Sequence, residues 1–267
     1  MLSAPGVRLA TWNVNSLKQR LDRVTAWIER HQPDVLCMQE TKLADDKAPT
    51  PIFRALGYEL ALHGKGRWNG VAIASRIGID QITCGIPTQD GWVDDGGRFL
   101  AATCGKLRVA SIYVPNGRVV DSEAYFAKLD WLERLARWLD DSDPATELAI
   151  CGDYNVAPED SDVWDPALAH GGTHVSSRER AAVARLREWG MVDVVRRFHP
   201  EPGLYTWWDY RAGHFPKNLG MRIDHVYVTP PLAERALGAE RDRDARKAST
   251  YPGIPSDHAP LIVDFED

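Results

Sequence analysis

The stretch ICGDYN, residues 150–155, decides how the rest of the chain is interpreted. It continues the apolar run ELAI, residues 147–150, which is typical of a short buried strand. After one glycine the strand ends in an aspartate, a tyrosine and an asparagine. Polar groups of this kind are costly to bury unless each has a partner. Asp153 and Asn155 therefore either cap a turn or face a ligand that needs them.

Similar apolar runs recur along the chain, and several are separated by helical patterns. The predicted strands are VRLATWNV (7–14), DVLCMQE (34–40), GVAIAS (70–75), FLAATC (99–104), LRVASIYVP (107–115), ELAICGDYN (147–155), RIDHVYVT (222–229) and APLIVDFE (259–266). Helices are predicted from residue 17 to 31, ending before Pro33, within 122–141, and over 181–189. Strands at both ends with helices between them predict α/β layers. No linker divides the strands into two groups, so residues 1–267 are expected to form one domain.

Polar residues stand at the ends of these strands in a pattern that constrains the strand directions. Glu40, Asn116 and Asp153 follow strands, Asp224 begins one, and His258 precedes one. If all of them meet at one end of the molecule, some strands run toward that end and others away from it. Mixed sheets are therefore expected rather than an all-parallel sheet.

Composition excludes several classes of protein. The 267 residues are 44% hydrophobic and 26% charged, which argues against disorder. A net charge of −6 does not fit a protein coated in basic residues for non-specific nucleic-acid binding. The four cysteines are far apart and form no CxxC pair, as in reduced intracellular proteins. With no secretory leader and no apolar run of about 18 residues, a cytoplasmic, nucleoid-associated protein without a membrane segment is expected.

The polar groups at the strand ends share one chemistry. Taken singly, each has an ordinary structural explanation, because Asn and Asp are common turn formers. Together they are rich in oxygen ligands and hold one histidine, without a Cys/His cluster of the kind that binds zinc. Such a set suits Mg²⁺ where phosphate is the other ligand. The set comprises Asn13, Asn15, Glu40, Asn69, Tyr113, Asn116, Asp153, Asn155, Asp224, Asp257 and His258.

The order of the motifs resembles a known family. TWNVNSL, MQETK, WNGVAI, YVPNG, GDYN, RIDH and SDHAPL occur as in the endonuclease/exonuclease/phosphatase superfamily. QETK, WNGVAI and TWWDYR with RID are similar to its exonuclease III-like branch, the apurinic/apyrimidinic (AP) endonucleases of DNA repair. The resemblance extends from Leu9 to Phe265. It implies a DNase I-like fold, in which two mixed β-sheets flanked by helices form a four-layered sandwich with the active site at one edge.

The resemblance also implies a metal centre. Glu40 would be the principal Mg²⁺ ligand, with Asn15 and Asp257 close to the ion, and Mn²⁺ is expected to substitute. Asn15 departs from the pattern, since some relatives carry Asp at this position. One fewer carboxylate is expected to weaken the affinity for the metal.

The remaining matched residues would act on the phosphate. By resemblance, Asp153 activates the attacking water, and Asn155 and Asn13 orient Asp153 and the phosphate oxygens. Asp224 would hold His258, which would donate a hydrogen bond to the scissile phosphate. These roles fit the needs of phosphodiester hydrolysis, namely a base, charge neutralisation and an oriented acid. Two further residues would face the same phosphate, Tyr113 and Asn116.

A second set of residues is expected to hold DNA. Trp207 and Trp208 stand in a loop that in the family helps to form a pocket for a sugar without its base. Neighbouring residues in an extended loop point opposite ways, so one tryptophan is expected to pack inward and the other to face the ligand. Arg222 is assigned to substrate binding with them. Other candidates for phosphate contacts are Arg211, Lys217, Arg67, Arg98 and Arg118.

These assignments predict a monomeric, Mg²⁺-dependent DNA repair phosphodiesterase. It would cleave duplex DNA 5′ to abasic sites, leaving a 3′-OH, and act on blocked 3′ ends as a 3′→5′ exonuclease and 3′-phosphatase. One alternative is a superfamily phosphodiesterase that acts on sphingomyelin, inositol phosphates or poly(A). A second is a non-catalytic DNA-binding module descended from a nuclease, although such a module would normally have lost its catalytic residues.

Overall fold

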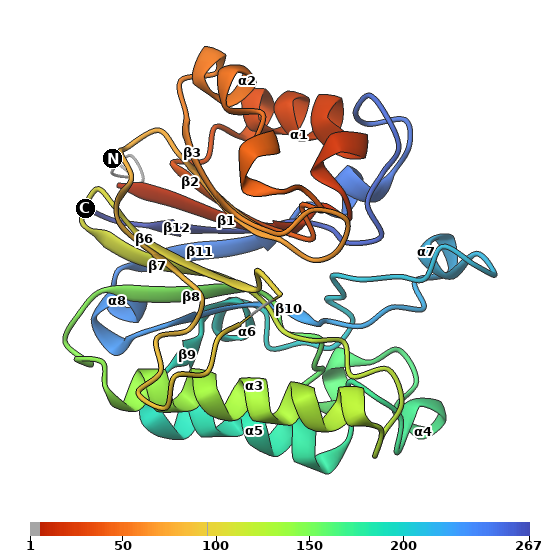
Figure 1. Ribbon diagram of the computed structural model, residues 1–267. Coiled ribbons are helices and arrows are strands. Elements are labelled where there is room, and N and C mark those ends of the chain that lie inside the picture. The colour runs from red at the N-terminus through yellow and green to blue at the C-terminus, as the bar shows by residue number, and fades with distance from the viewer. Residues whose placement is uncertain (1–5, 95) are drawn as a thin grey trace.

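The computed structural model describes residues 6–94 and 96–267 and shows two β-sheets packed face to face (Figure 1). The strands of the first sheet are β1 (Val7–Asn13), β2 (Val35–Gln39), β3 (Glu59–His63), β4 (Val71–Ser75), β11 (Ala236–Arg241) and β12 (Leu261–Phe265). Across this sheet the order is β11-β12-β1-β2-β4-β3. Its first and last segments of chain therefore lie side by side at the centre, as antiparallel β1 and β12.

The second sheet is built from the middle of the chain. Its strands are β5 (Asp80–Cys84), β6 (Phe99–Cys104), β7 (Leu107–Tyr113), β8 (Leu148–Asp153), β9 (Val192–Asp193) and β10 (Asp224–Val228). The order across the sheet is β5-β6-β7-β8-β10-β9. In both sheets parallel and antiparallel pairs occur, such as parallel β7–β8 and antiparallel β8–β10. The expectation of mixed sheets is thereby confirmed.

Helices cover the outer faces of both sheets. The helices are α1 (Leu17–His31), α2 (Thr50–Ala55), α3 (Glu123–Asp140), α4 (Pro166–Ala169), α5 (Ser177–Trp189), α6 (Val194–Phe198), α7 (His214–Lys217) and α8 (Pro230–Glu234). Short 3₁₀ turns span Asp45–Lys47, Asp160–Asp162 and Arg243–Arg246. Figure 1 shows α1 and α2 over the first sheet and α3 with α5 over the second, while α7 sits on a loop that projects from the body. The result is the α/β/β/α sandwich that the sequence predicts.

Alternation along the central strands explains why they read as continuous apolar runs. In β2, Val35 and Cys37 face the core between the sheets, whereas Leu36 and Met38 face the core beneath α1. In β8, Ala149 and Cys151 face the inter-sheet core, and Ile150 faces α3 and α5. Successive side chains of a strand point to opposite faces, and here both faces are buried.

Strand register brings the polar strand ends together at one end of the sandwich. On the second sheet, Asp153 pairs with Tyr113 of β7 on one side and with Asp224 of β10 on the other. On the first sheet, Asn13 pairs with Gln39, which places Glu40 directly beyond the end of β2. The two sheets therefore deliver carboxylates, an amide and a phenol to the same edge.

Candidate functional site

Asn13 connects the two sheets at this edge. Its side-chain amide donates to Glu40 Oε1 and to Asp153 Oδ2, each at 2.9 Å. Glu40 follows β2 of the first sheet, while Asp153 ends β8 of the second. Asn13 is fully buried, and one amide group satisfies two carboxylates from opposite sheets. The carboxylates are thus held close together by a neutral donor.

Asp153 ends β8 directly after a glycine at which the backbone lies close to that of β7. Gly152 has a φ of 147°, and a Cβ at this position would lie 2.0 Å from the carbonyl oxygen of Ile112, so only glycine fits. Asn155, in the left-handed region with φ 51°, donates its backbone N–H to Asp153 Oδ1 at 2.9 Å. Burial raises the pKa of Asp153, and the Asp224 carboxylate adds to this effect against His258 and Asn13. A carboxylate with a raised pKa is a better proton acceptor near neutral pH.

His258 is the second predicted catalytic residue at this edge. Its Nδ1 lies 2.8 Å from Asp224 Oδ2, and its Nε2 lies 3.8 Å from Asp153 Oδ2. Burial alone would lower the pKa of His258, but the negative charges of Asp224 and Asp153 outweigh it and raise the pKa. The imidazole is therefore protonated near neutral pH and presents an N–H toward Asp153. This pairing has the orienting geometry of a catalytic triad.

Residues outside the predicted set hold Asp224 and His258 in place. The buried Thr206 hydroxyl accepts the backbone N–H of Asp224 at 3.1 Å. The Ser256 hydroxyl donates to the Asn13 carbonyl at 2.7 Å and accepts the backbone N–H of His258 at 3.2 Å. Sequence reasoning missed both residues, although Ser256 belongs to the quoted SDHAPL motif.

Two carboxylates and the histidine lie close together at this edge, and Asp257 lies outside this group. Ligand atoms of Glu40, Asp153 and His258 all lie within 4.8 Å of one another. Asn15 donates from Nδ2 to Asp257 Oδ1 at 2.9 Å, which connects these two predicted metal residues to each other. The ammonium group of Lys42 lies 2.9 Å from Glu40 Oε2 and 2.6 Å from Asn15 Oδ1. This donor set therefore already attracts a positive charge.

Lys42 is the clearest residue of the candidate site to which the sequence analysis assigned no role. It stands in the QETK motif two residues after Glu40, and its backbone has a positive φ of 53°. The sequence did offer one signal for Lys42, its position two residues after Glu40, because the Glu40 carboxylate can balance the charge of a lysine so close to it. The structure places it where it balances Glu40.

The predicted phosphate-facing residues form a connected row beside Asp153. Asn116 donates from Nδ2 to Asn155 Oδ1 at 3.1 Å, and Asn155 donates from Nδ2 to the Val114 carbonyl at 2.9 Å. Burial, reinforced by the negative charges of Glu40 and Asp153, raises the pKa of Tyr113, so its phenol stays protonated. Arg98, a candidate for phosphate contact, stacks over the Tyr113 ring at 4.9 Å.

The two tryptophans of the TWWDYR stretch have different surroundings. Trp207 is half-buried, and its indole N–H donates to Asp257 Oδ2 at 3.1 Å. Trp208 is fully buried and packs edge-on against Phe215 at 5.2 Å, with Arg243 over its ring. The prediction that one ring packs inward is confirmed, and that ring is Trp208. The assignment of Trp208 to substrate binding has to be corrected, because its ring is enclosed by protein.

The assignment of Arg222 to substrate binding also has to be corrected. Its side chain is buried, with Nε bonded to Asp162 at 2.6 Å and Nη1 bonded to Asp193 at 2.7 Å and to His225 at 3.0 Å. Nη2 donates to Asp162 as well. A guanidinium enclosed in this way offers no group to a DNA phosphate. Arg222 joins the loop at Asp162 to the strand that carries Asp224.

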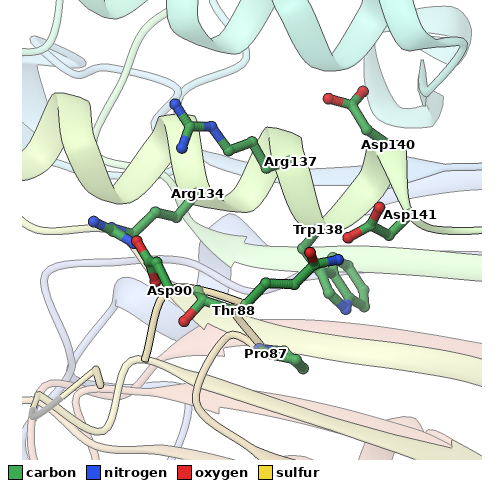
Figure 2. A pocket seen from close by; sticks show the side chains of 9 residues that line it. Pro87, Thr88, Asp90, Arg134, Arg137, Trp138, Asp140 and Asp141 are labelled. Carbon is green, nitrogen blue, oxygen red and sulfur yellow. The ribbon is translucent and has the colours of Figure 1, made fainter. Parts of the chain in front are cut away.

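A pocket of about 340 Å³ lies apart from these residues, between the segment after β5 and α3 (Figure 2). Its lining includes Thr88, Asp90, Arg134 and Trp138. Arg134 bonds to Asp90 at 2.7 Å and to Asp130 at 2.9 Å, so its charge is balanced within the protein. Among the described residues that line this pocket, none belongs to the candidate site.

Comparison with known proteins decides the family. The family model described as "Endonuclease/Exonuclease/phosphatase family" matches residues 10–258. This protein belongs to that family. It is 33% identical to exodeoxyribonuclease III of Haemophilus influenzae over 97% of this chain and 100% of that protein. The resemblance in the sequence motifs is thereby confirmed.

Solved structures of the family agree with the fold. An AP endonuclease from Archaeoglobus fulgidus superposes with a TM-score of 0.92 at 38% identity, covering 98% of this chain and 100% of that one. A 3′ phosphatase from Neisseria, bound to a product DNA hairpin, superposes with a TM-score of 0.93 at 36% identity over 98% and 100%. This protein is accordingly a hydrolytic nuclease of the exonuclease III and AP endonuclease type.

Within residues 6–94 and 96–267, no helix combines the length and apolar character needed to cross a membrane.

Proposed function

We propose that this protein is a monomeric, Mg²⁺-dependent phosphodiesterase that incises duplex DNA 5′ to abasic sites and processes 3′ ends. The observation that carries the proposal is the convergence of Glu40, Asp153 and His258 within 4.8 Å, at an edge to which both sheets contribute. Family membership supplies the reaction type, hydrolysis by a nuclease. The names of the relatives supply the candidate substrates, an AP site and a 3′ phosphate.

The residues present fit a hard divalent cation. Glu40 and Asn15 supply carboxylate and amide oxygens that already face the Lys42 ammonium, and Asp257 is tied to Asn15. Oxygen-rich sets of this kind suit Mg²⁺ or Mn²⁺. When bound, the ion would neutralise charge that develops on the phosphate during hydrolysis.

The side chains divide the remaining work. Asp153 accepts a proton from the attacking water, for which its raised pKa prepares it. His258, charged and held by Asp224, donates a hydrogen bond to a phosphate oxygen. Asn116 and Asn155 hold the phosphate on the side of Tyr113. Of the two tryptophans of the TWWDYR stretch, the half-buried Trp207 is the one available to the sugar. Asn13 keeps the base and the metal carboxylate at a fixed separation.

The experiment uses a labelled duplex with one tetrahydrofuran abasic analogue, an undamaged blunt duplex, and a nicked duplex with a 3′ phosphate. Wild-type protein and Asp153→Asn are compared in Mg²⁺ and in EDTA. We expect incision 5′ to the lesion and 3′ processing only with Mg²⁺. We expect Asp153→Asn to lower turnover by about 100-fold or more, because a positioned base contributes that much.

Each substrate tests a separate part of the proposal. Processing of the 3′ phosphate without incision at the abasic analogue would confine the activity to 3′ ends. No cleavage of any of the three duplexes in Mg²⁺ or Mn²⁺ would reject DNA as the substrate. Wild-type turnover by Asp153→Asn at saturating Mg²⁺ would reject Asp153 as the base.

A further inference from the structure

A buried ion pair lies directly behind the row of phosphate-facing amides. Lys128 of α3 and Glu179 of α5 are both completely buried, and the Lys128 ammonium bonds to Glu179 Oε1. The surface ion pairs between the same two helices are quite different. Arg185 of α5, for example, bonds to Glu133 of α3 with both side chains more than a third exposed.

The Lys128 ammonium points at the backbone of two predicted site residues. It donates to the Asn155 carbonyl at 2.7 Å and lies 3.4 Å from the Asn116 carbonyl. Its aliphatic part packs on Gly117, where a Cβ would come within 2.9 Å of Lys128 Cδ. The third direction is taken by Glu179. An ammonium group has three protons, and all three are directed to these partners.

Glu179 anchors the lysine from the other side. Its Oε1 accepts the backbone N–H of His174 at 3.0 Å, and its Oε2 accepts the backbone N–H of Ser176 at 3.1 Å. Glu179 is also the third residue of α5 and completes a capping box with Ser176. The carboxylate is therefore held by the start of the helix, and it gives the lysine a fixed reference point.

The contact at Asn155 reaches the reaction centre in one step. The same residue that accepts from Lys128 donates its own N–H to Asp153 Oδ1 at 2.9 Å. Its side chain accepts from Asn116 at 3.1 Å. A movement of the Asn155 backbone would therefore shift both the predicted base, Asp153, and the phosphate-facing amide of Asn116. Misplacement of catalytic groups by about 1 Å can cost about 100-fold in rate.

Stability alone is a poor reason for this pair. Burying two charges carries a desolvation cost that their attraction often fails to recover, and well-packed apolar residues are often equally stable. Two of the three hydrogen bonds of the Lys128 ammonium go to backbone carbonyls of the site. What the pair provides is a fixed geometry for Asn116 and Asn155.

We propose that Lys128, oriented by Glu179, is a positioning residue for phosphodiester hydrolysis. It holds the Asn116 and Asn155 backbones so that Asp153 and the phosphate-facing amides keep their relative places. This role rests on the proposed function, since it concerns the same site. It concerns turnover more than substrate affinity, because Lys128 is buried beneath the site and contacts it through the backbone.

The test separates the positioning role from folding. Lys128→Met and Glu179→Gln each leave one member of the pair without its partner, and both are expected to lower stability and kcat. The double variant Lys128→Met/Glu179→Gln removes both charges but keeps a side-chain oxygen that can accept backbone N–H groups at the start of α5, and we expect it to regain much of the stability. Its kcat on whichever duplex the wild type cleaves is still expected to be about 10- to 100-fold low, with KM changed less than about threefold. Glu133→Gln, which breaks the exposed pair between the same helices, is the matched control and should keep wild-type kcat.

A second readout does not depend on activity. The backbone amide resonance of Asn155 reports its hydrogen bond to Asp153, and we expect it to shift in the double variant but not in Glu133→Gln. If the stable double variant has wild-type kcat, or if its Asn155 resonance is unchanged, the inference is rejected. If the wild type cleaves none of the duplexes, the proposed function fails, and the Asn155 resonance still decides whether Lys128 positions that backbone.

Discussion

Asp224 Oδ2 and His258 Nδ1 lie 2.8 Å apart, and both side chains are buried where the two sheets meet. Asp224 begins a strand of the second sheet, whereas His258 precedes a strand of the first. The contact joins the sheets and keeps the imidazole charged, because Asp224 raises the pKa of His258 against the effect of burial.

Removing this carboxylate charge is expected to impair turnover. In Asp224→Asn the histidine loses its main counter-charge, and we expect kcat on the cleaved duplex to fall by about 100-fold or more. The control is Asp264→Asn, since Asp264 is a partly exposed carboxylate paired with Arg8 on the same sheet as His258. Steady-state kinetics of both variants give the comparison. Equal kcat for the two variants would show that Asp224 has no catalytic role.

Alanine substitutions of the two adjacent tryptophans are expected to have different effects on stability and activity. Trp208→Ala removes a fully buried ring and should cost about 3–5 kcal/mol in the free energy of unfolding, with activity falling only as far as folding does. Trp207→Ala should cost less stability and more turnover, because the Trp207 N–H bonds to Asp257. Urea unfolding and DNA cleavage by both variants provide the measurements. A stable Trp208→Ala protein with impaired cleavage would instead show that Trp208 contributes to substrate binding.

The central strands could be predicted from the sequence, while the sheet edges could not. Every run identified as a strand is an inner strand of one of the sheets, where both faces are largely buried and most residues are apolar. The missed strands are the edges, β3, β5, β9 and β11. Asp80–Cys84, for example, is mostly exposed and carries no apolar pattern. Edge strands form because a neighbour offers hydrogen bonds, which a single sequence does not reveal.

The candidate site followed from the sequence to a similar extent. Polar residues at strand ends were identifiable because burial without partners is costly, and register then brings Asp153, Tyr113 and Asp224 together. Side-chain direction was not identifiable. Arg222 lies two residues before the inner strand β10, where a surface arginine could also stand, and only its three-dimensional partners show that it is enclosed.

The salt dependence of DNA binding tests the correction to Arg222. Its guanidinium is occupied by Asp162 and Asp193, so Arg222→Met should leave the slope of log Kd against log salt unchanged. Loss of a phosphate contact would instead reduce that slope by about 0.9. The same variant should lose about 3–5 kcal/mol of stability, because the buried Asp193 loses its salt bridge to Arg222 and Asp162 keeps only Arg196. Binding is therefore measured at a temperature where the variant is folded, as circular dichroism can show.

His225 is expected to make the protein less stable at acidic pH. It is fully buried, with Nε2 at 2.8 Å from the Val156 carbonyl and Nδ1 facing the Arg222 guanidinium at 3.0 Å. The neutral imidazole thus has one donor and one acceptor satisfied, and a second proton would point at a cation. Burial and the charge of Arg222 lower the pKa of His225 to about 4, against the opposing effect of Asp193 and Asp162.

The sign of the effect follows from the lowered pKa. Above about pH 6.5, His225 is neutral in both the folded and the unfolded chain and contributes no pH dependence. Between about pH 6.5 and 4 the unfolded chain binds a proton that the folded protein excludes. The free energy of unfolding therefore decreases as the pH is lowered, by at most about 1.4 kcal/mol per pH unit. His225→Gln can keep a donor and an acceptor without titrating. Urea unfolding from pH 7.5 to 4.5 should therefore show a shallower loss for His225→Gln than for wild type, and parallel curves would contradict a neutral buried His225.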